Sequence, residues 1–175
     1  DGKELIDPGV IPAGSLNSSA YDQSQVWSNF VSGTAYSGYP ITNAFNGDLS
    51  TRSLESGSTG HTFTPPSAIT VTSSLRIYIA YGDASATNVL KVNGTDYSSL
   101  ITSTGNIGWI TIPNISSVTS IFYGVSPGGA EDSSVSAIEV DGRILVDSGV
   151  SVTNVPTIAS TVRANSSAGF SIVSY

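Results

Sequence analysis

The stretch Ala137-Ile-Glu-Val-Asp-Gly-Arg-Ile-Leu-Val146 decides the fold class, because it places an Asp-Gly pair between two runs rich in β-branched residues. Asp and Gly tolerate the positive φ angles of a type I′ turn, so the pattern predicts a β-hairpin. A second stretch, Leu90-Lys-Val-Asn-Gly-Thr-Asp-Tyr97, has Asn93-Gly94 in the same position. The sequence therefore predicts two antiparallel hairpins.

Outward from these hairpins, short apolar runs alternate with turn residues, which is typical of a sandwich or barrel rather than of βαβ units. Charged residues make up only 11% of the chain, so long amphipathic helices are disfavoured and the fold class is all-β. One helical turn is expected near Gln23 to Phe30, and loops at Pro65-Pro66 and Pro127-Gly128-Gly129. The other predicted strands are Leu75–Tyr81, Asn88–Val92, Trp109–Ile112 and Ile121–Val125.

Composition excludes several classes of function. Six basic residues against 13 acidic ones give a net charge of −7, which argues against nucleic acid as a partner. No run of about 18 apolar residues is present, so insertion into a membrane is not expected. With no cysteine, the chain has neither disulfides nor a thiolate metal site.

An internal repeat joins the two ends of the chain. Asp1-Gly-Lys-Glu-Leu-Ile-Asp-Pro-Gly-Val10 matches Asp141-Gly-Arg-Ile-Leu-Val-Asp-Ser-Gly-Val150 at Asp, Gly, Leu, Asp, Gly and Val, with an offset of 140 residues. The pattern predicts modules repeated head to tail in a longer protein, with the repeated strand at the junction. The alternative is chance similarity between turns that favour the same residues. The predicted assembly residues are Leu5, Ile6, Leu145 and Val146.

This repeat suggests a division of the chain into three parts. Residues 1–16 are predicted to be an end strand and linker from a preceding repeat, and residues 17–146 a β-sandwich domain. Residues 147–175 are predicted to be a linker and the start of a following β element, because the last seven residues alternate apolar and polar side chains.

The run Ile41-Thr-Asn-Ala-Phe-Asn-Gly-Asp-Leu-Ser-Thr-Arg52 resembles the early loop of galactose-binding-like, discoidin-type domains. Ser136-Ala-Ile-Glu-Val-Asp-Gly142 is similar to the strand that closes those domains. The resemblance covers residues 17–146 and implies a galactose-binding-like jelly-roll β-sandwich with flanking linker strands.

In that family the early loop often holds a structural calcium ion, and the resemblance implies Asn43, Asn46, Asp48 and Thr51 as its ligands here. The chain departs from the family pattern at three positions. Asn46 stands where Asp is usual, Ser53 where Trp is usual, and Ala137 where a ligating Glu is common. The alternative is a turn whose Asn and Asp side chains cap their own backbone.

The family's loops also bind sugars or other surface ligands with aromatic and basic side chains. The nearest equivalents in this sequence are Tyr36, Tyr39, Arg52 and His61. Ordinary packing within loops is the alternative for each of them.

A further resemblance is to repeat modules in virion proteins of marine and cyanobacterial phages. It lies in Ala137 to Asp147 and in Ala168 to Val173, which occur in that order. It implies a tail fibre or capsid decoration on the virion surface, a role in host attachment, and as partners copies of the chain, other virion proteins and cell-surface glycans.

The sequence carries no familiar catalytic motif: it has one His, no Cys, and no nucleophile elbow, P-loop or His-Glu-x-x-His helix. Three hypotheses follow. The first is a non-enzymatic structural or adhesion module of a phage virion appendage or extracellular fibre, and the second a carbohydrate-binding module. The third is a domain attached to an enzyme that lies outside this sequence.

Overall fold

The computed structural model describes residues 20–22, 24–56, 60–81, 88–102, 105, 107–125 and 134–150. Several sequence predictions lie outside these ranges. They concern the end strand with Leu5 and Ile6, the loop at Pro127-Gly128-Gly129 and the β element after residue 150.

The larger sheet has the order β1-β13-β12-β6-β9, and β3 also pairs with β12. All of its pairings are antiparallel except that of β1 with β13, which is parallel. β12 is thus the central strand of this sheet, because it pairs with β3, β6 and β13. The bounds are β1 Ala20–Tyr21, β3 Ser53–Leu54, β6 Leu75–Tyr81, β9 Gly108–Ile112, β12 Ser134–Val140 and β13 Arg143–Leu145.

A second sheet has the order β2-β4-β11-β7-β8 and is antiparallel throughout. Its bounds are β2 Val31–Ser32, β4 His61–Phe63, β7 Asn88–Val92, β8 Thr95–Asp96 and β11 Ile121–Val125. A two-stranded ladder joins β5 Ile69–Thr70 to β10 Ser117–Val118. Three short 3₁₀ helices are η1 Trp27–Phe30, η2 Ile41–Phe45 and η3 Ser98–Leu100 in the described ranges.

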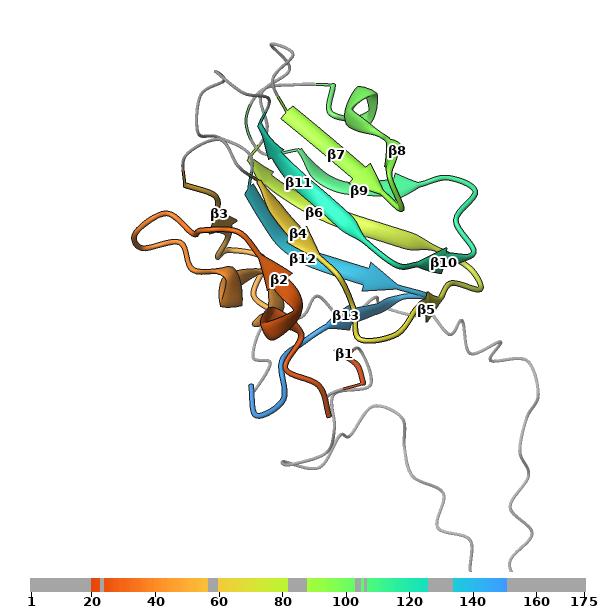
Figure 1. Cartoon of the computed structure of the whole chain (residues 1–175), viewed down its shortest axis with the longest axis horizontal. Helices are drawn as coiled ribbons and strands as arrows, with labels where there is room; N and C mark the ends of the chain where they lie inside the picture. The colour runs from red at the N-terminus through yellow and green to blue at the C-terminus, as the bar shows by residue number, and fades with distance from the viewer. Residues whose placement is uncertain are drawn as a thin grey trace, which may run out of the picture.

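Successive strands alternate between the two sheets, because β4, β7 and β11 lie in one and β6, β9 and β12 in the other. Figure 1 shows the strands of the smaller sheet overlying those of the larger one and running in roughly the same direction. This alternation confirms the predicted all-β jelly-roll sandwich. The strands predicted at Leu75–Tyr81, Asn88–Val92 and Ile121–Val125 have the same bounds in the structure, and η1 falls in the predicted helical turn.

Both predicted hairpins are present. Asn93 and Gly94 have φ angles of 51° and 81° between β7 and β8, and Asp141 and Gly142 have 52° and 79° between β12 and β13. Positive φ at both central residues is the type I′ conformation that the Asn-Gly and Asp-Gly pairs predict.

The core lies between the two sheets. β6 alternates buried and half-buried residues, as a strand with one face on the core must. Aromatic rings close one side of this core: Phe63 lies 5.6 Å from Phe45 and 6.3 Å from Trp27 between ring centroids. The largest aliphatic side chains of the core include Leu75, Ile77, Ile79, Leu90, Ile121, Ile138 and Leu145.

The structure corrects the expected role of two assembly residues. Leu145 and Val146 are fully buried, Leu145 in the main core and Val146 in a smaller cluster with Ala137 and Ile144. Their side chains therefore hold the closing strand against the rest of this sandwich. Residues 147–150, which the sequence assigned to a linker, also pack on the sandwich, since the Asp147 carboxylate accepts hydrogen bonds from the Ser28 N–H and hydroxyl.

No helix in the described part of the chain has the length and hydrophobicity that a bilayer span needs.

We predict that Leu145→Asp lowers the free energy of unfolding by at least about 3 kcal/mol, because it removes a buried apolar side chain and buries a carboxylate. Thermal unfolding followed by circular dichroism measures the change. Leu145→Met is the control, since it keeps the volume and should cost less than about 1.5 kcal/mol. Equal melting temperatures for wild type and Leu145→Asp would show that the closing strand does not contribute to stability.

Candidate functional site

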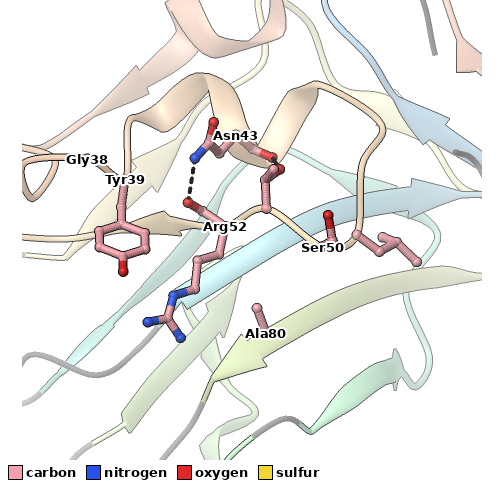
Figure 2. Close-up of a pocket in the computed structure, with 8 residues that line it drawn as sticks. Gly38, Tyr39, Asn43, Ser50, Arg52 and Ala80 are labelled. Atoms are coloured by element: carbon pink, nitrogen blue, oxygen red, sulfur yellow. Dashed lines mark hydrogen bonds between the residues drawn. The ribbon is translucent and has the colours of Figure 1, made fainter. Parts of the chain in front are cut away.

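A pocket of about 500 Å³ opens between the loop that follows η2 and the outer face of β6. Figure 2 shows the Arg52 side chain extending from the loop toward the strand that carries Ala80, with Tyr39 beside it. The lining of the pocket mixes an aromatic ring, aliphatic groups and several polar groups, as is common in ligand pockets. The lining residues are Gly38, Tyr39, Asn43, Leu49, Ser50, Thr51, Arg52 and Ala80.

A tight turn presents the two tyrosines. The Tyr39 N–H donates to the Tyr36 carbonyl across the turn at 3.0 Å, and Gly38 has a φ of 85°, which suits glycine. Two further backbone bonds attach the turn to β3, from the Tyr36 N–H to the Leu54 carbonyl and from the Leu54 N–H to the Tyr39 carbonyl. Tyr36 and Tyr39 therefore lie beside Arg52, which immediately precedes β3.

The loop from η2 to β3 is anchored at its base. Ala44 and Phe45 are fully buried, so the 3₁₀ helix is held against the core. The Asn43 side-chain amide donates to the Arg52 carbonyl at 2.9 Å, which joins the two ends of the loop (Figure 2). The Ser136 hydroxyl on β12 donates to the Thr51 carbonyl and ties the loop to the sheet.

The predicted calcium ligands come together, but in the arrangement of a turn that satisfies its own polar groups. The Asn46 amide nitrogen donates to the Thr51 hydroxyl at 2.8 Å, and the Asn46 side-chain oxygen accepts from the Asp48 N–H. One oxygen of Asp48 accepts from the Ser50 hydroxyl and N–H, and these two bonds hold the pKa of Asp48 below its ordinary value.

This donor set does not fit calcium well. Calcium takes about six to eight oxygen ligands, several of them usually carboxylates. The loop offers one carboxylate, already engaged by Ser50, and an amide N–H of Asn46 points at the Thr51 oxygen. No group of three or more His, Cys, Asp or Glu residues gathers anywhere in the described ranges. Calcium binding stays a prediction.

Arg52 joins the aromatic residues of the site. Its guanidinium carbon lies 4.9 Å from the centre of the Tyr39 ring and 5.7 Å from that of the Tyr81 ring. The Tyr39 ring is in turn 6.4 Å from the ring of Tyr36, which is 44% exposed. Three of the four predicted ligand-binding residues are thus adjacent.

Sequence reasoning missed Tyr81 and the polar lining residue Ser50. Tyr81 is the last residue of β6, and its proximity to Arg52 depends on β3 and β6 both pairing with β12. No local sequence signal marks that proximity.

His61, the fourth predicted ligand-binding residue, is not in the site. Its side chain is fully buried on β4, where its Nδ1 lies 3.1 Å from the hydroxyl of Tyr123. The same hydroxyl lies 2.6 Å from the hydroxyl of buried Ser53. Burial lowers the pKa of His61 and raises that of Tyr123, so both side chains stay neutral near pH 7. His61 belongs to a buried polar cluster within the sandwich.

No family model and no curated protein matches the sequence. Among solved structures, the chain is similar to CpGH89CBM32-4 from Clostridium perfringens, a carbohydrate-binding module, with 20% identity and a TM-score of 0.43. The match covers 63% of this chain and 92% of that one. Similarity at this level says nothing about what this chain binds.

The calcium hypothesis predicts tighter calcium binding when position 46 carries the carboxylate that is usual in the discoidin-type pattern. Asn46→Asp replaces the amide that faces Thr51 with a carboxylate oxygen, so calcium should raise the melting temperature of this variant by several degrees more than that of the wild type. Differential scanning calorimetry with millimolar calcium measures the shift, with magnesium as the control ion. Equal shifts in variant and wild type would show that the loop is not a calcium site.

Proposed function

We propose that the protein is a non-enzymatic adhesion module that binds glycans in the pocket beside Tyr39 and Arg52. The observation that carries the proposal is the adjacency of an exposed tyrosine, a half-buried tyrosine and an arginine at the rim of a pocket with polar lining. We place it at an extracellular or virion surface, where such a module meets cell-surface glycans.

Tyrosine rings suit sugars because they offer an apolar face and a polar hydroxyl group together. The Tyr36 ring is accessible, and the turn that carries it is attached to β3 by two backbone hydrogen bonds. A ring held in this way loses little conformational entropy when a ligand stacks on it.

The polar lining supports the same proposal. Asn43, Ser50 and Thr51 line the pocket, and the Ser50 hydroxyl, which donates to Asp48, keeps lone pairs that can accept a hydrogen bond from a ligand. A sugar carries several hydroxyl groups that both donate and accept, so it needs such short polar side chains around it.

A non-catalytic role is consistent with the chemistry of the pocket. The lining residues that the structure describes include no carboxylate, histidine or cysteine, the side chains that most often serve as general acid, general base or nucleophile. We therefore propose binding alone for this site.

Tyr36→Ala should weaken glycan binding roughly tenfold or more without changing the melting temperature, because the ring is exposed and supports no core residue. Tyr36→Phe should keep most of the affinity. A glycan array on the wild type identifies the ligand, and isothermal titration measures it on the variants. Binding that survives Tyr36→Ala unchanged would place the ligand elsewhere, and an array without any saturable ligand would exclude the function.

A second candidate is a structural unit of a virion appendage or extracellular fibre, assembled from repeated modules. The structure gives each residue shared by the two copies of the repeat a definite role. Asp141 and Gly142 form the turn, Leu145 fills the core, Asp147 binds Ser28, Gly149 has a φ of 81°, and Val150 packs on the smaller cluster. The positions that recur in residues 1–10 are those a closing strand needs, which favours a repeated module over chance similarity.

Head-to-tail assembly predicts different effects for the two copies. Leu5→Asp should abolish self-association, measured by sedimentation equilibrium at high protein concentration, and leave the melting temperature unchanged. Leu145→Asp should lower the melting temperature instead, because that leucine is in the core of this module. A wild-type chain that stays monomeric at all concentrations would rule out association through the first copy.

A further inference from the structure

We infer that the pocket selects an acidic sugar, whose carboxylate or sulfate group binds the guanidinium of Arg52. This inference rests on the proposed glycan-binding function and names the class of glycan. The observation behind it is that Arg52 forms no ion pair with any carboxylate of the described chain.

Other basic residues of the described chain show the contrast. Arg76 lies over the Trp109 ring at 4.8 Å, much as Arg52 lies over Tyr39, but it also forms a 2.5 Å ion pair with Glu139. Lys91 lies opposite Asp96 in the β7–β8 ladder. In a chain with a net charge of −7, carboxylates are abundant. A half-buried arginine that pairs with none of the carboxylates in the described ranges holds a positive charge that a ligand can use.

The two carboxylates nearest to Arg52 in sequence, Glu55 and Asp48, form no ion pair with it in the described part of the chain. Glu55 is fully buried and accepts a hydrogen bond from the Gly60 N–H. One oxygen of Asp48 accepts two hydrogen bonds from Ser50, which orient the group within its own turn.

The geometry of the guanidinium suits an anionic group. Tyr39 and Tyr81 both lie within cation–π distance of the Arg52 guanidinium. The five N–H groups lie in the plane of the guanidinium and are suited to the paired oxygens of a carboxylate or sulfate. The Asn43 bond to the Arg52 carbonyl fixes the backbone from which this side chain extends.

Trigalacturonate and its fully methyl-esterified form test the inference, because they share every ring hydroxyl and differ in charge. We expect the wild type to bind the acid roughly 10- to 100-fold more tightly than the ester, as charge-assisted hydrogen bonds imply. Arg52→Gln should bind acid and ester equally. Arg143→Gln is the matched control, since Arg143 lies over the Tyr21 ring at 5.8 Å but does not line the pocket.

A sulfated galactan oligosaccharide and its desulfated form make up a second pair. The pair with the larger ratio of affinities, charged over uncharged form, identifies the anionic group that the pocket binds. Circular dichroism at the titration temperature confirms that Arg52→Gln is folded. Equal affinity of the wild type for both members of each pair, or a preference for the acid that survives Arg52→Gln, would overturn the inference. Neutral glycans that still bind through Tyr36 would leave the proposed function standing, so the two failures are distinguishable.

Discussion

The carboxylate of Asp141 is the contact on which the larger sheet depends. It accepts hydrogen bonds from the backbone N–H groups of Thr72, Ser73 and Ser74, and so joins the β12–β13 turn to the segment that enters β6. Although desolvation opposes them, these donors hold the pKa of Asp141 well below its usual range. Asn93 binds Thr119 and Ser120 in the same way at the β7–β8 turn. Each type I′ turn therefore also anchors a neighbouring loop.

The pocket follows from the position of β12. That strand pairs with β6 on one side and with β13 and β3 on the other, and its Ser136 hydroxyl holds the Thr51 carbonyl. Arg52 lies between Thr51 and β3, so it is carried to the outer face of the same sheet and reaches Tyr81 at the end of β6. A displacement of the closing hairpin would separate the two walls of the pocket.

Packing also explains why similar residue types have different roles. Tyr36 and Tyr123 are both tyrosines, yet Tyr36 is exposed in a turn, whereas Tyr123, in the middle of β11, is buried with Ser53 and His61. The small Ser53 side chain leaves room for the Tyr123 hydroxyl 2.6 Å away. His61 belongs to the same buried polar cluster, which removes it from the candidate site.

The sequence by itself determined the local structure: the strands of β6, β7 and β11 and the two type I′ hairpins. Alternating side chains and Asn-Gly or Asp-Gly pairs act over a few residues, so a pattern of that length predicts them. Only the tertiary structure decided which side chains are exposed, because burial depends on pairings between distant strands. For that reason Leu145 and His61 proved to be core residues, and Tyr81 joined Arg52 beside a pocket that no local pattern could mark.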